Sequence, residues 1–166
     1  HVGVTPDHAV AALCRFSGVK RRMELLADID GVRVYDDFAH HPTAIATTLE
    51  GLRNQVGDEP ILAIIEPRSN TMKQGVHQQT LIPSAAAADR VLWGNLSEMN
   101  WLPELVNGWR AEHGELDHHG VEESVDALIT RAVDQLPETC HIVIMSNGGF
   151  GGIHRKLVAE LEKRRG

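Results

Sequence analysis

The sequence is poor in several features that mark whole classes of protein. Only two of its 166 residues are cysteine, and Cys14 and Cys140 stand far apart. Two isolated thiols do not build a disulfide framework, so they suit a reducing cytoplasm. No apolar run reaches the roughly 18 residues of a membrane span, and we expect no signal peptide. The composition therefore predicts a cytoplasmic protein without a membrane partner.

Positive charge is also scarce. Sixteen Lys and Arg residues stand against 23 Asp and Glu residues, which gives a net charge of -7. Nucleic-acid binding requires a basic face, so we exclude nucleic acid as the main partner, although a local basic pocket for a small anion remains compatible. The length and the 42% content of hydrophobic residues are typical of one globular domain with a real core.

The common catalytic signatures are missing. The chain has no Gly-x-Ser-x-Gly elbow, no catalytic-cysteine signature and no Gly-x-x-x-x-Gly-Lys-Ser/Thr phosphate-binding loop. Its ten histidines include His118 and His119, but no pair has zinc-motif spacing with a companion ligand. We therefore predict no metal site, and we expect that this chain alone transfers no phosphate.

Hydrophobic periodicity predicts the fold class. Asp30-Gly31 between two extended segments is a strong hairpin signal. A continuous apolar run of strand length covers residues 61–65, and short strands are predicted at residues 90–93 and 141–145. Helical spacing covers residues 45–56, 81–88, 102–109, 121–136 and 153–161. This alternation predicts an α/β, Rossmann-like, mostly parallel sheet with helices on both faces and an N-terminal antiparallel hairpin element.

An additional helix is predicted at the start of the chain. Thr5 can cap it, Pro6 suits its first position, and Gly18 suits its end. A helix at this place has nothing before it to pack on, which suggests that the chain begins inside a longer protein.

Three polar clusters follow predicted strands, where ligands of open α/β sheets bind. The first is Tyr-Asp-Asp-Phe-Ala-His-His-Pro at residues 35–42. Adjacent strand residues point to opposite sides, so one of Asp36 and Asp37 can face a ribose or a magnesium shell while the other braces the loop. His40 and His41 suit phosphate orientation or proton transfer. The residues alone leave open the alternative that these side chains only cap the next helix.

The second cluster is Glu-Pro-Arg-Ser-Asn-Thr-Met-Lys-Gln-Gly at residues 66–75. Arg68 can hold a carboxylate with a bidentate fork, and Lys73 adds a point charge. Asn70 and Thr71 offer neutral hydrogen bonds. The alternative is a solvated loop that binds nothing.

The third cluster is Met-Ser-Asn-Gly-Gly-Phe-Gly-Gly-Ile-His at residues 145–154. Glycines between a strand and a helix let backbone amides approach an anion. A Rossmann dinucleotide fingerprint is the competing interpretation. It is disfavoured because the run follows the last strand and no acidic-ended strand comes after it.

These three clusters, together with residues 18–22, carry a family resemblance. The segment Gly-Val-Lys-Arg-Arg at residues 18–22, followed by Asp-Asp-Phe-Ala-His-His-Pro-Thr at 36–43, resembles the start of the C-terminal domain of Mur ligases. The form with two Asp and two His is similar to the branch that uses UDP-N-acetylmuramate as acyl donor. Ligases of that branch that add L-alanine typically carry a Gln-Pro-His-Arg type segment after the next strand. This chain instead has Glu-Pro-Arg-Ser-Asn-Thr-Met-Lys at residues 66–73. Together with residues 145–154, that segment is similar to murein peptide ligases.

The resemblance covers essentially the whole chain and implies its organisation. Residues 1–20 would be the tail of a central domain with its linker, and residues 21–166 the acceptor-binding domain. ATP would phosphorylate the lactyl carboxylate of UDP-N-acetylmuramate. The amine of L-alanyl-γ-D-glutamyl-meso-diaminopimelate, recovered from old cell wall, would then attack the acyl phosphate. The partners are these substrates and the protein's own N-terminal and central domains, of which the central one holds Mg²⁺.

The resemblance also implies residue roles. Arg22 matches a nucleotide contact on phosphate and Asp37 one on ribose, and His40 matches a catalytic position near the reacting centre. Placement and charge assign five further residues to the tripeptide acceptor: Arg68, Asn70, Lys73, Ser146 and Asn147. The alternatives are the C-terminal domain of a UDP-N-acetylmuramate–L-alanine ligase and a freestanding domain that binds a nucleotide or peptide without catalysis.

Overall fold

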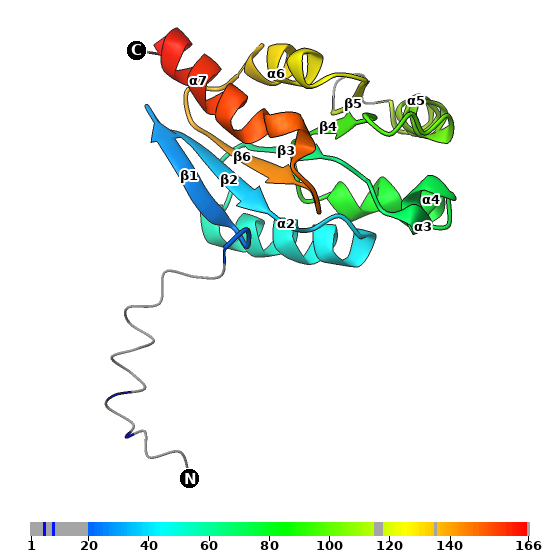
Figure 1. Cartoon of the computed structure of the whole chain (residues 1–166), viewed down its shortest axis with the longest axis horizontal. Helices are drawn as coiled ribbons and strands as arrows, with labels where there is room; N and C mark the ends of the chain where they lie inside the picture. The colour runs from blue at the N-terminus through cyan, green and yellow to red at the C-terminus, as the bar shows by residue number, and fades with distance from the viewer. Residues whose placement is uncertain (1–4, 6–7, 9–19, 115–117, 135, 166) are drawn as a thin grey trace.

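A computed structural model of the chain describes residues 5, 8, 20–114, 118–134 and 136–165. This part forms a six-stranded sheet between two layers of helices, as Figure 1 shows. The strands are β1 (Glu24–Ile29), β2 (Val32–Asp37), β3 (Ile61–Ile65), β4 (Arg90–Gly94), β5 (His119–Glu122) and β6 (Cys140–Met145). Their order is β1-β2-β6-β3-β4-β5, with β1–β2 antiparallel and the other pairs parallel. The predicted fold class is confirmed.

The hairpin between β1 and β2 turns at the predicted residues. Asp30 and Gly31 have φ values of 46° and 84°, so both adopt the left-handed backbone that a type I′ turn requires. Ile29 and Val32 face each other at the strand ends. Arg165 donates from the last helix to the Asp30 carbonyl oxygen at 2.9 Å. The hairpin is therefore fixed to the end of the chain.

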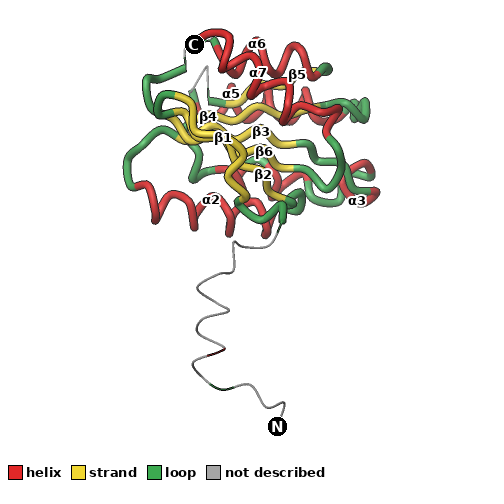
Figure 2. Tube along the Cα trace, turned by 60° about the vertical axis from the view of Figure 1, so that its left-hand side comes forward, coloured by secondary structure: helices red, strands yellow, loops and turns green. Residues whose placement is uncertain are grey.

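Helices cover both faces of the sheet, as the tube in Figure 2 shows. One layer holds α2 (Pro42–Val56), α3 (Asn70–Lys73), α4 (Gln78–Leu81), the 3₁₀ turn η1 (Pro83–Ala85) and α5 (Trp101–His113). The other holds α6 (Val125–Val133), the 3₁₀ turn η2 (Phe150–Gly152) and α7 (Ile153–Arg165).

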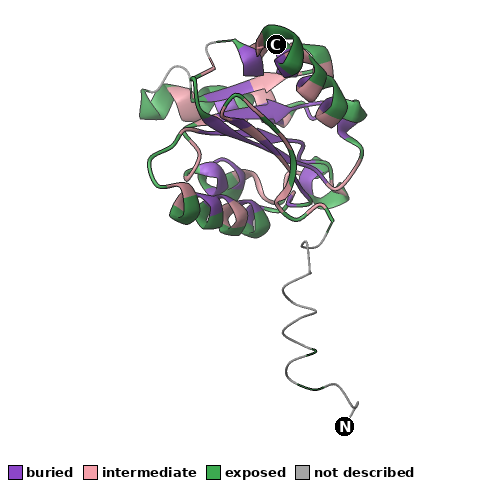
Figure 3. Cartoon of the chain, turned by 90° about the vertical axis from the view of Figure 1, so that its left-hand side faces the viewer, coloured by how far each residue is buried: buried purple, intermediate pink, exposed green. Residues whose placement is uncertain are grey.

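Alternate residues of the strands pack into two hydrophobic cores, one on each face of the sheet. Ala63 and Ile65 of β3 face the α2 layer, and Leu62 and Ile64 face the α6–α7 layer. The strands β3, β4 and β6 are almost wholly buried between helices whose outer surfaces are exposed, as Figure 3 shows, whereas the edge strand β1 is partly exposed. No helix in the described part of the chain is both long and apolar enough to cross a membrane.

Two predicted helices differ from the observed elements. The helix predicted over 81–88 is the end of α4 and the turn η1, because Pro83 supplies no N–H to continue the helix. Val121, counted at the start of the stripe 121–136, lies in β5 instead. Ser124 begins α6 by accepting a hydrogen bond from the Ala127 N–H. The helix predicted from Thr5 to Gly18 falls largely outside the described residues.

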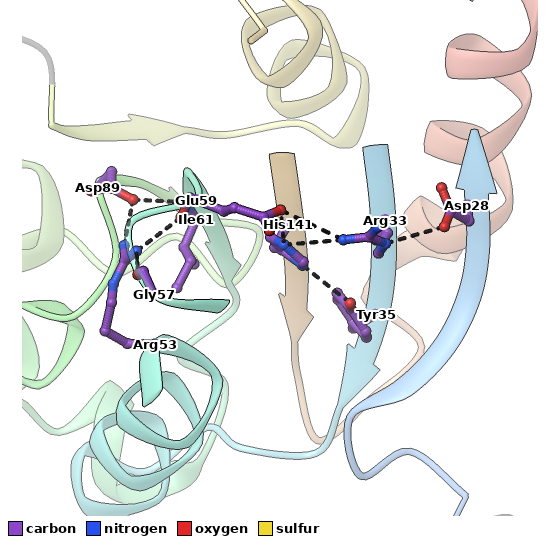
Figure 4. A network of polar contacts seen from close by, with 9 residues as sticks. All are labelled: Asp28, Arg33, Tyr35, Arg53, Gly57, Glu59, Ile61, Asp89 and His141. Carbon is purple, nitrogen blue, oxygen red and sulfur yellow. Dashed lines mark hydrogen bonds and ion pairs between the residues drawn. The ribbon is translucent and has the colours of Figure 1, made fainter. Parts of the chain in front are cut away.

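A polar network lies at the amino ends of β2, β3 and β6, at the edge of the sheet opposite the three predicted clusters (Figure 4). The buried ring of His141 lies with Nε2 2.9 Å from Glu59 Oε2 and Nδ1 3.1 Å from the Tyr35 hydroxyl. Arg33 bridges Glu59 at 3.6 Å and Asp28 at 3.1 Å. These contacts join β1, β2, β6 and the segment before β3, so the network stabilises the sheet at this edge.

Candidate functional site

The sheet topology brings the three polar clusters together at one edge. Asp37 of β2 pairs in register with Met145 of β6, and Met145 pairs with Ile65 of β3. All three strands run in the same direction, so residues 35–42, 66–75 and 145–154 continue from neighbouring carboxyl ends. This is the place where an open α/β sheet binds its ligands.

Asp36 and Asp37 point to opposite faces of the sheet, as the sequence predicted. Asp37, 6% exposed, accepts hydrogen bonds from the Met23 N–H at 2.9 Å and the Ala39 N–H at 2.8 Å on the α2 side. Asp36 accepts from Arg21 Nε at 3.0 Å and from His154 Nε2 at 3.0 Å on the α7 side. Asp36 is thus the brace, and Asp37 is the carboxylate beside the surface cavity described below.

Arg21 is a connecting residue that the sequence interpretation missed. Besides Asp36, its guanidinium donates to the carbonyl oxygens of Ser146 at 2.6 Å and Gly148 at 3.0 Å. The same group lies over the ring of Phe38, 5.3 Å from its centre. Arg21 therefore joins the start of the domain to β2 and to the glycine-rich turn. Two consecutive arginines in a single sequence give no signal of which one is anchored.

Arg22 lies between two anchored residues and is itself exposed. Its neighbours Arg21 and Met23 have φ values of 58° and 47°, so the backbone folds back at this point. The fold places Arg22 at a surface cavity of about 590 Å³. The cavity is also lined by Met23, Asp37, Phe38, Ala39, His40, His41, Thr43, Ala44, Thr47 and Thr48.

The two adjacent histidines have different roles in the structure. His40 Nδ1 lies 2.9 Å from the Phe38 carbonyl oxygen. Because a carbonyl only accepts, Nδ1 carries the hydrogen, and the neutral ring keeps a lone pair on Nε2 that can take a proton. His41 instead accepts at Nδ1 from the Thr43 N–H at 3.3 Å and so caps α2. The capping alternative therefore describes His41 and does not describe His40.

Glu66 and Ser146 form a buried pair between β3 and β6. The Ser146 hydroxyl donates to Glu66 Oε2 at 2.5 Å and accepts from the Gly148 N–H at 3.0 Å. Glu66 is 4% exposed and Ser146 is 0% exposed. Ser146 thus lies beneath the surface, with its hydroxyl directed at Glu66. Glu66 belongs to the second cluster, but no separate role was predicted for it from the sequence.

The remaining predicted acceptor residues lie on the exposed side of the same edge. The Arg68 guanidinium lies directly against the backbone of Gly148. Asn70 and Lys73 are exposed on the short helix α3, and Asn147 is half-buried in the glycine-rich turn. The structure therefore brings Arg68 and Asn147 to one turn and places Asn70 and Lys73 on the neighbouring segment.

The residues around the cavity fit a nucleotide. Arg22 offers a cation and α2 begins beside the cavity with the positive end of its dipole, and both favour a phosphate. Asp37 accepts three protein hydrogen bonds, including one from the Thr48 hydroxyl at 3.4 Å. A carboxylate has about four acceptor positions, so one remains for a ribose hydroxyl. Within the described ranges no three His, Cys, Asp or Glu side chains gather to hold a metal ion.

Comparisons with known proteins show what the chain is similar to. A family model described as Mur ligase, glutamate ligase domain, matches residues 21–148. An Escherichia coli K12 protein is 46% identical over 165 residues, 99% of this chain and 35% of that protein. That protein is named UDP-N-acetylmuramate–L-alanyl-gamma-D-glutamyl-meso-2,6-diaminoheptandioate ligase.

A solved structure and a second ligase complete the comparison. The crystal structure of a murein peptide ligase from Psychrobacter arcticus is 45% identical with a TM-score of 0.78, and the match covers 96% of this chain and 34% of that one. A UDP-N-acetylmuramate–L-alanine ligase of Clavibacter sepedonicus is 52% identical, but over 66 residues, 40% of this chain and 14% of that protein. The chain thus spans about a third of the length of the tripeptide-ligase relatives, 35% and 34% in the two cases.

Proposed function

The chain belongs to the Mur ligase family as its C-terminal domain, and on this premise we propose that it is the acceptor-binding domain of a cytoplasmic, ATP-dependent ligase of peptidoglycan recycling. The ligase joins UDP-N-acetylmuramate to L-alanyl-γ-D-glutamyl-meso-diaminopimelate. One observation carries the choice of acceptor. Sequence similarity to a ligase named for this tripeptide extends over 99% of the chain at 46% identity, whereas sequence similarity to two L-alanine ligases extends over 40% and 55% of it.

In the proposed reaction ATP activates the muramate carboxylate as an acyl phosphate, with Mg²⁺ held mainly by the central domain. Arg22 binds phosphate at the start of α2, and Asp37 accepts a ribose hydroxyl. His40 accepts the proton of the attacking amine on Nε2, because its Nδ1–H is committed to the Phe38 carbonyl oxygen. The anchoring of Arg21 and Met23 on Asp36 and Asp37 supports the placement of Arg22.

The acceptor lies outside the ends of β3 and β6 in this proposal. The tripeptide carries several carboxylates, which Arg68 and Lys73 bind, while Asn70 and Asn147 supply neutral hydrogen bonds. Ser146 acts from beneath the surface through its hydrogen bond to Glu66. The exposure of Arg68, Asn70 and Lys73 on one side of this edge supports the assignment.

The proposed division of the chain makes residues 1–20 the tail of the central domain with its linker, and 21–166 the acceptor-binding domain. Its closure over the other domains would hold the amine against the acyl phosphate, and such positioning can supply roughly 7–11 kcal/mol of the barrier. The sequence has no phosphate-binding loop. We therefore expect the isolated chain to release no phosphate from ATP in the presence of both substrates, and steady release would contradict this.

A ligation assay tests the proposal. The full-length protein that contains this chain is supplied with ATP, Mg²⁺ and UDP-N-acetylmuramate, and with either the tripeptide or L-alanine. Product with the tripeptide alone supports the proposed ligase. Product with L-alanine alone keeps the family and overturns the acceptor. No product with either acceptor favours a freestanding domain that binds without catalysis.

A further inference from the structure

Glu66 is a buried carboxylate whose charge has no protein partner in the described part of the chain. Glu66 is 4% exposed, and the one hydrogen bond to its side-chain carboxylate comes from the neutral Ser146 hydroxyl. Asp36, at the same edge, is held by two cationic or ionisable groups, Arg21 and His154. No Lys, Arg or His among the described residues lies within ion-pair distance of Glu66.

A carboxylate in this position is expensive to maintain without a counter-charge. A buried carboxylate is normally matched by an opposite charge or by several hydrogen bonds. The Ser146 hydroxyl bonds Oε2, so Oε1 is the atom left for a further partner. Since the edge is the place where substrates bind, the missing cation can come from a ligand.

Two observations favour an ammonium group over a metal ion. The described residues contain no group of three or more metal-ligating side chains, so Glu66 lacks companion ligands. Arg68 follows Glu66 after the buried Pro67, and its guanidinium lies against Gly148, whose N–H is bonded to Ser146. A buried carboxylate and an exposed guanidinium therefore flank the same turn, and together they match an amino acid with both its ammonium and its carboxylate free.

We propose that Glu66 binds the free ammonium, and Arg68 the free carboxylate, at the far end of the meso-diaminopimelate residue of the acceptor. This inference rests on the proposed function and adds Glu66 as a residue that determines specificity. Neighbouring strands lie about 4.8 Å apart, so β3 lies roughly 10 Å from β2 across β6. A three-residue peptide extended by about 3.5 Å per residue spans that distance. Its reacting amine can thus lie near His40 while its far end reaches Glu66.

The test compares three acceptors in the full-length ligase. The first is the natural tripeptide, the second carries 2-aminopimelate and lacks the far ammonium, and the third carries L-lysine and lacks the far carboxylate. We expect the wild-type enzyme to have a kcat/KM roughly 10–100-fold lower with the second and third acceptors, as for loss of a charge-assisted hydrogen bond.

Glu66→Gln and Arg68→Gln should give opposite patterns. Glu66→Gln keeps an acceptor for the Ser146 hydroxyl, and we expect it to abolish the preference for diaminopimelate over 2-aminopimelate and leave the preference over lysine. Arg68→Gln should abolish the preference over lysine alone. Glu123→Gln removes an exposed carboxylate after β5 and serves as the charge-matched control, with all three preferences unchanged. A role of Glu66 in folding alone would lower kcat/KM for all acceptors equally.

Melting temperatures of every variant identify those that fail to fold, and Glu66→Asp, which keeps the charge, replaces Glu66→Gln if that variant is unstable. With Glu66→Asp we expect the ligase still to prefer diaminopimelate over 2-aminopimelate, with a smaller ratio of the two kcat/KM values. Equal wild-type rates with diaminopimelate and 2-aminopimelate would overturn the inference without any variant. Ligation of L-alanine but of no tripeptide would overturn the proposed function instead.

Discussion

Gly148 and Arg68 occupy adjoining space so tightly that a Cβ atom on Gly148 would overlap the Arg68 guanidinium. The backbone of the glycine-rich turn thus sets where Arg68 can lie. The overlapping group is the end of a flexible side chain, so a substitution at Gly148 should move Arg68 and leave the fold intact.

We predict that Gly148→Ala weakens acceptor binding by about as much as Arg68→Ala. Loss of a charge-assisted hydrogen bond costs about 1.5–3 kcal/mol, and this would raise the acceptor KM of the full-length ligase roughly 10–150-fold. The double variant should be no worse than either single one, because both remove the same contact. Gly149→Ala is the matched control, since a Cβ there meets nothing within 4 Å. An unchanged acceptor KM in Arg68→Ala would exclude the proposed role.

Substitution of Arg21 should lower the stability of the domain, whereas substitution of Arg22 should weaken nucleotide binding. Arg21→Lys keeps the charge but cannot reproduce three hydrogen bonds to Asp36, Ser146 and Gly148. We expect it to lower the free energy of unfolding of the chain by about 2 kcal/mol in urea denaturation. Arg22→Ala, at an exposed position, should change that free energy by less than about 0.5 kcal/mol and weaken nucleotide binding in the full-length ligase. Equal stability of the two variants would show that the Arg21 contacts carry little energy.

The two histidines of the first cluster should also differ. His40→Gln removes the proposed proton acceptor, and we expect kcat of the full-length ligase to fall roughly 10²–10⁴-fold with an unchanged melting temperature. His41→Ala removes the cap of α2, and we expect the unfolding free energy to fall by about 0.5–1 kcal/mol. Rate measurements at saturating substrate, together with thermal unfolding, distinguish the two effects. A His40→Gln enzyme with wild-type kcat would remove His40 from the chemistry.

His119 should make the stability of the domain depend on pH. Burial, followed by the positive surroundings of His118, Arg110 and His113, lowers the pKa of His119 to about 4. Its Nδ1 accepts a hydrogen bond from the Trp93 indole N–H at 3.1 Å, which also requires an unprotonated nitrogen.

The sign of this effect follows from the direction of the shift. The unfolded chain has the ordinary histidine pKa of about 6.5, so between pH 6.5 and 4 it binds more protons than the folded chain. Stability from His119 is therefore complete above about pH 6.5 and is lost as the pH falls toward 4, by at most about 3.4 kcal/mol, of which about 2 kcal/mol is lost by pH 5. Urea denaturation at pH 7.5 and pH 5 measures the loss. In His119→Gln, which keeps an acceptor for Trp93, the difference between pH 7.5 and pH 5 should shrink by about 2 kcal/mol. A variant with the same pH dependence as the wild type would assign the loss to other groups.

The sequence by itself determined the parts of this protein that depend on neighbouring residues. Asp30-Gly31 specifies a hairpin because both positions need a positive φ, which these residues tolerate. The apolar run of β3 and the separation of Asp36 from Asp37 follow from strand geometry, so the sheet and its ligand-binding edge were predictable. The strand β5 was missed because it is only four residues long and its residues are of mixed polarity.

Only the tertiary structure decided which side chains meet across the edge. Glu66 and Ser146 are 80 residues apart, and Arg21 and Gly148 are 127 apart, and no local pattern encodes such pairs. The consecutive pairs Arg21-Arg22 and His40-His41 are chemically alike. Arg21 nevertheless bonds Asp36, Ser146 and Gly148 while Arg22 is exposed, and His40 bonds the Phe38 carbonyl oxygen while His41 caps α2. That difference depends on burial and on the groups brought alongside by folding, which a single sequence does not contain.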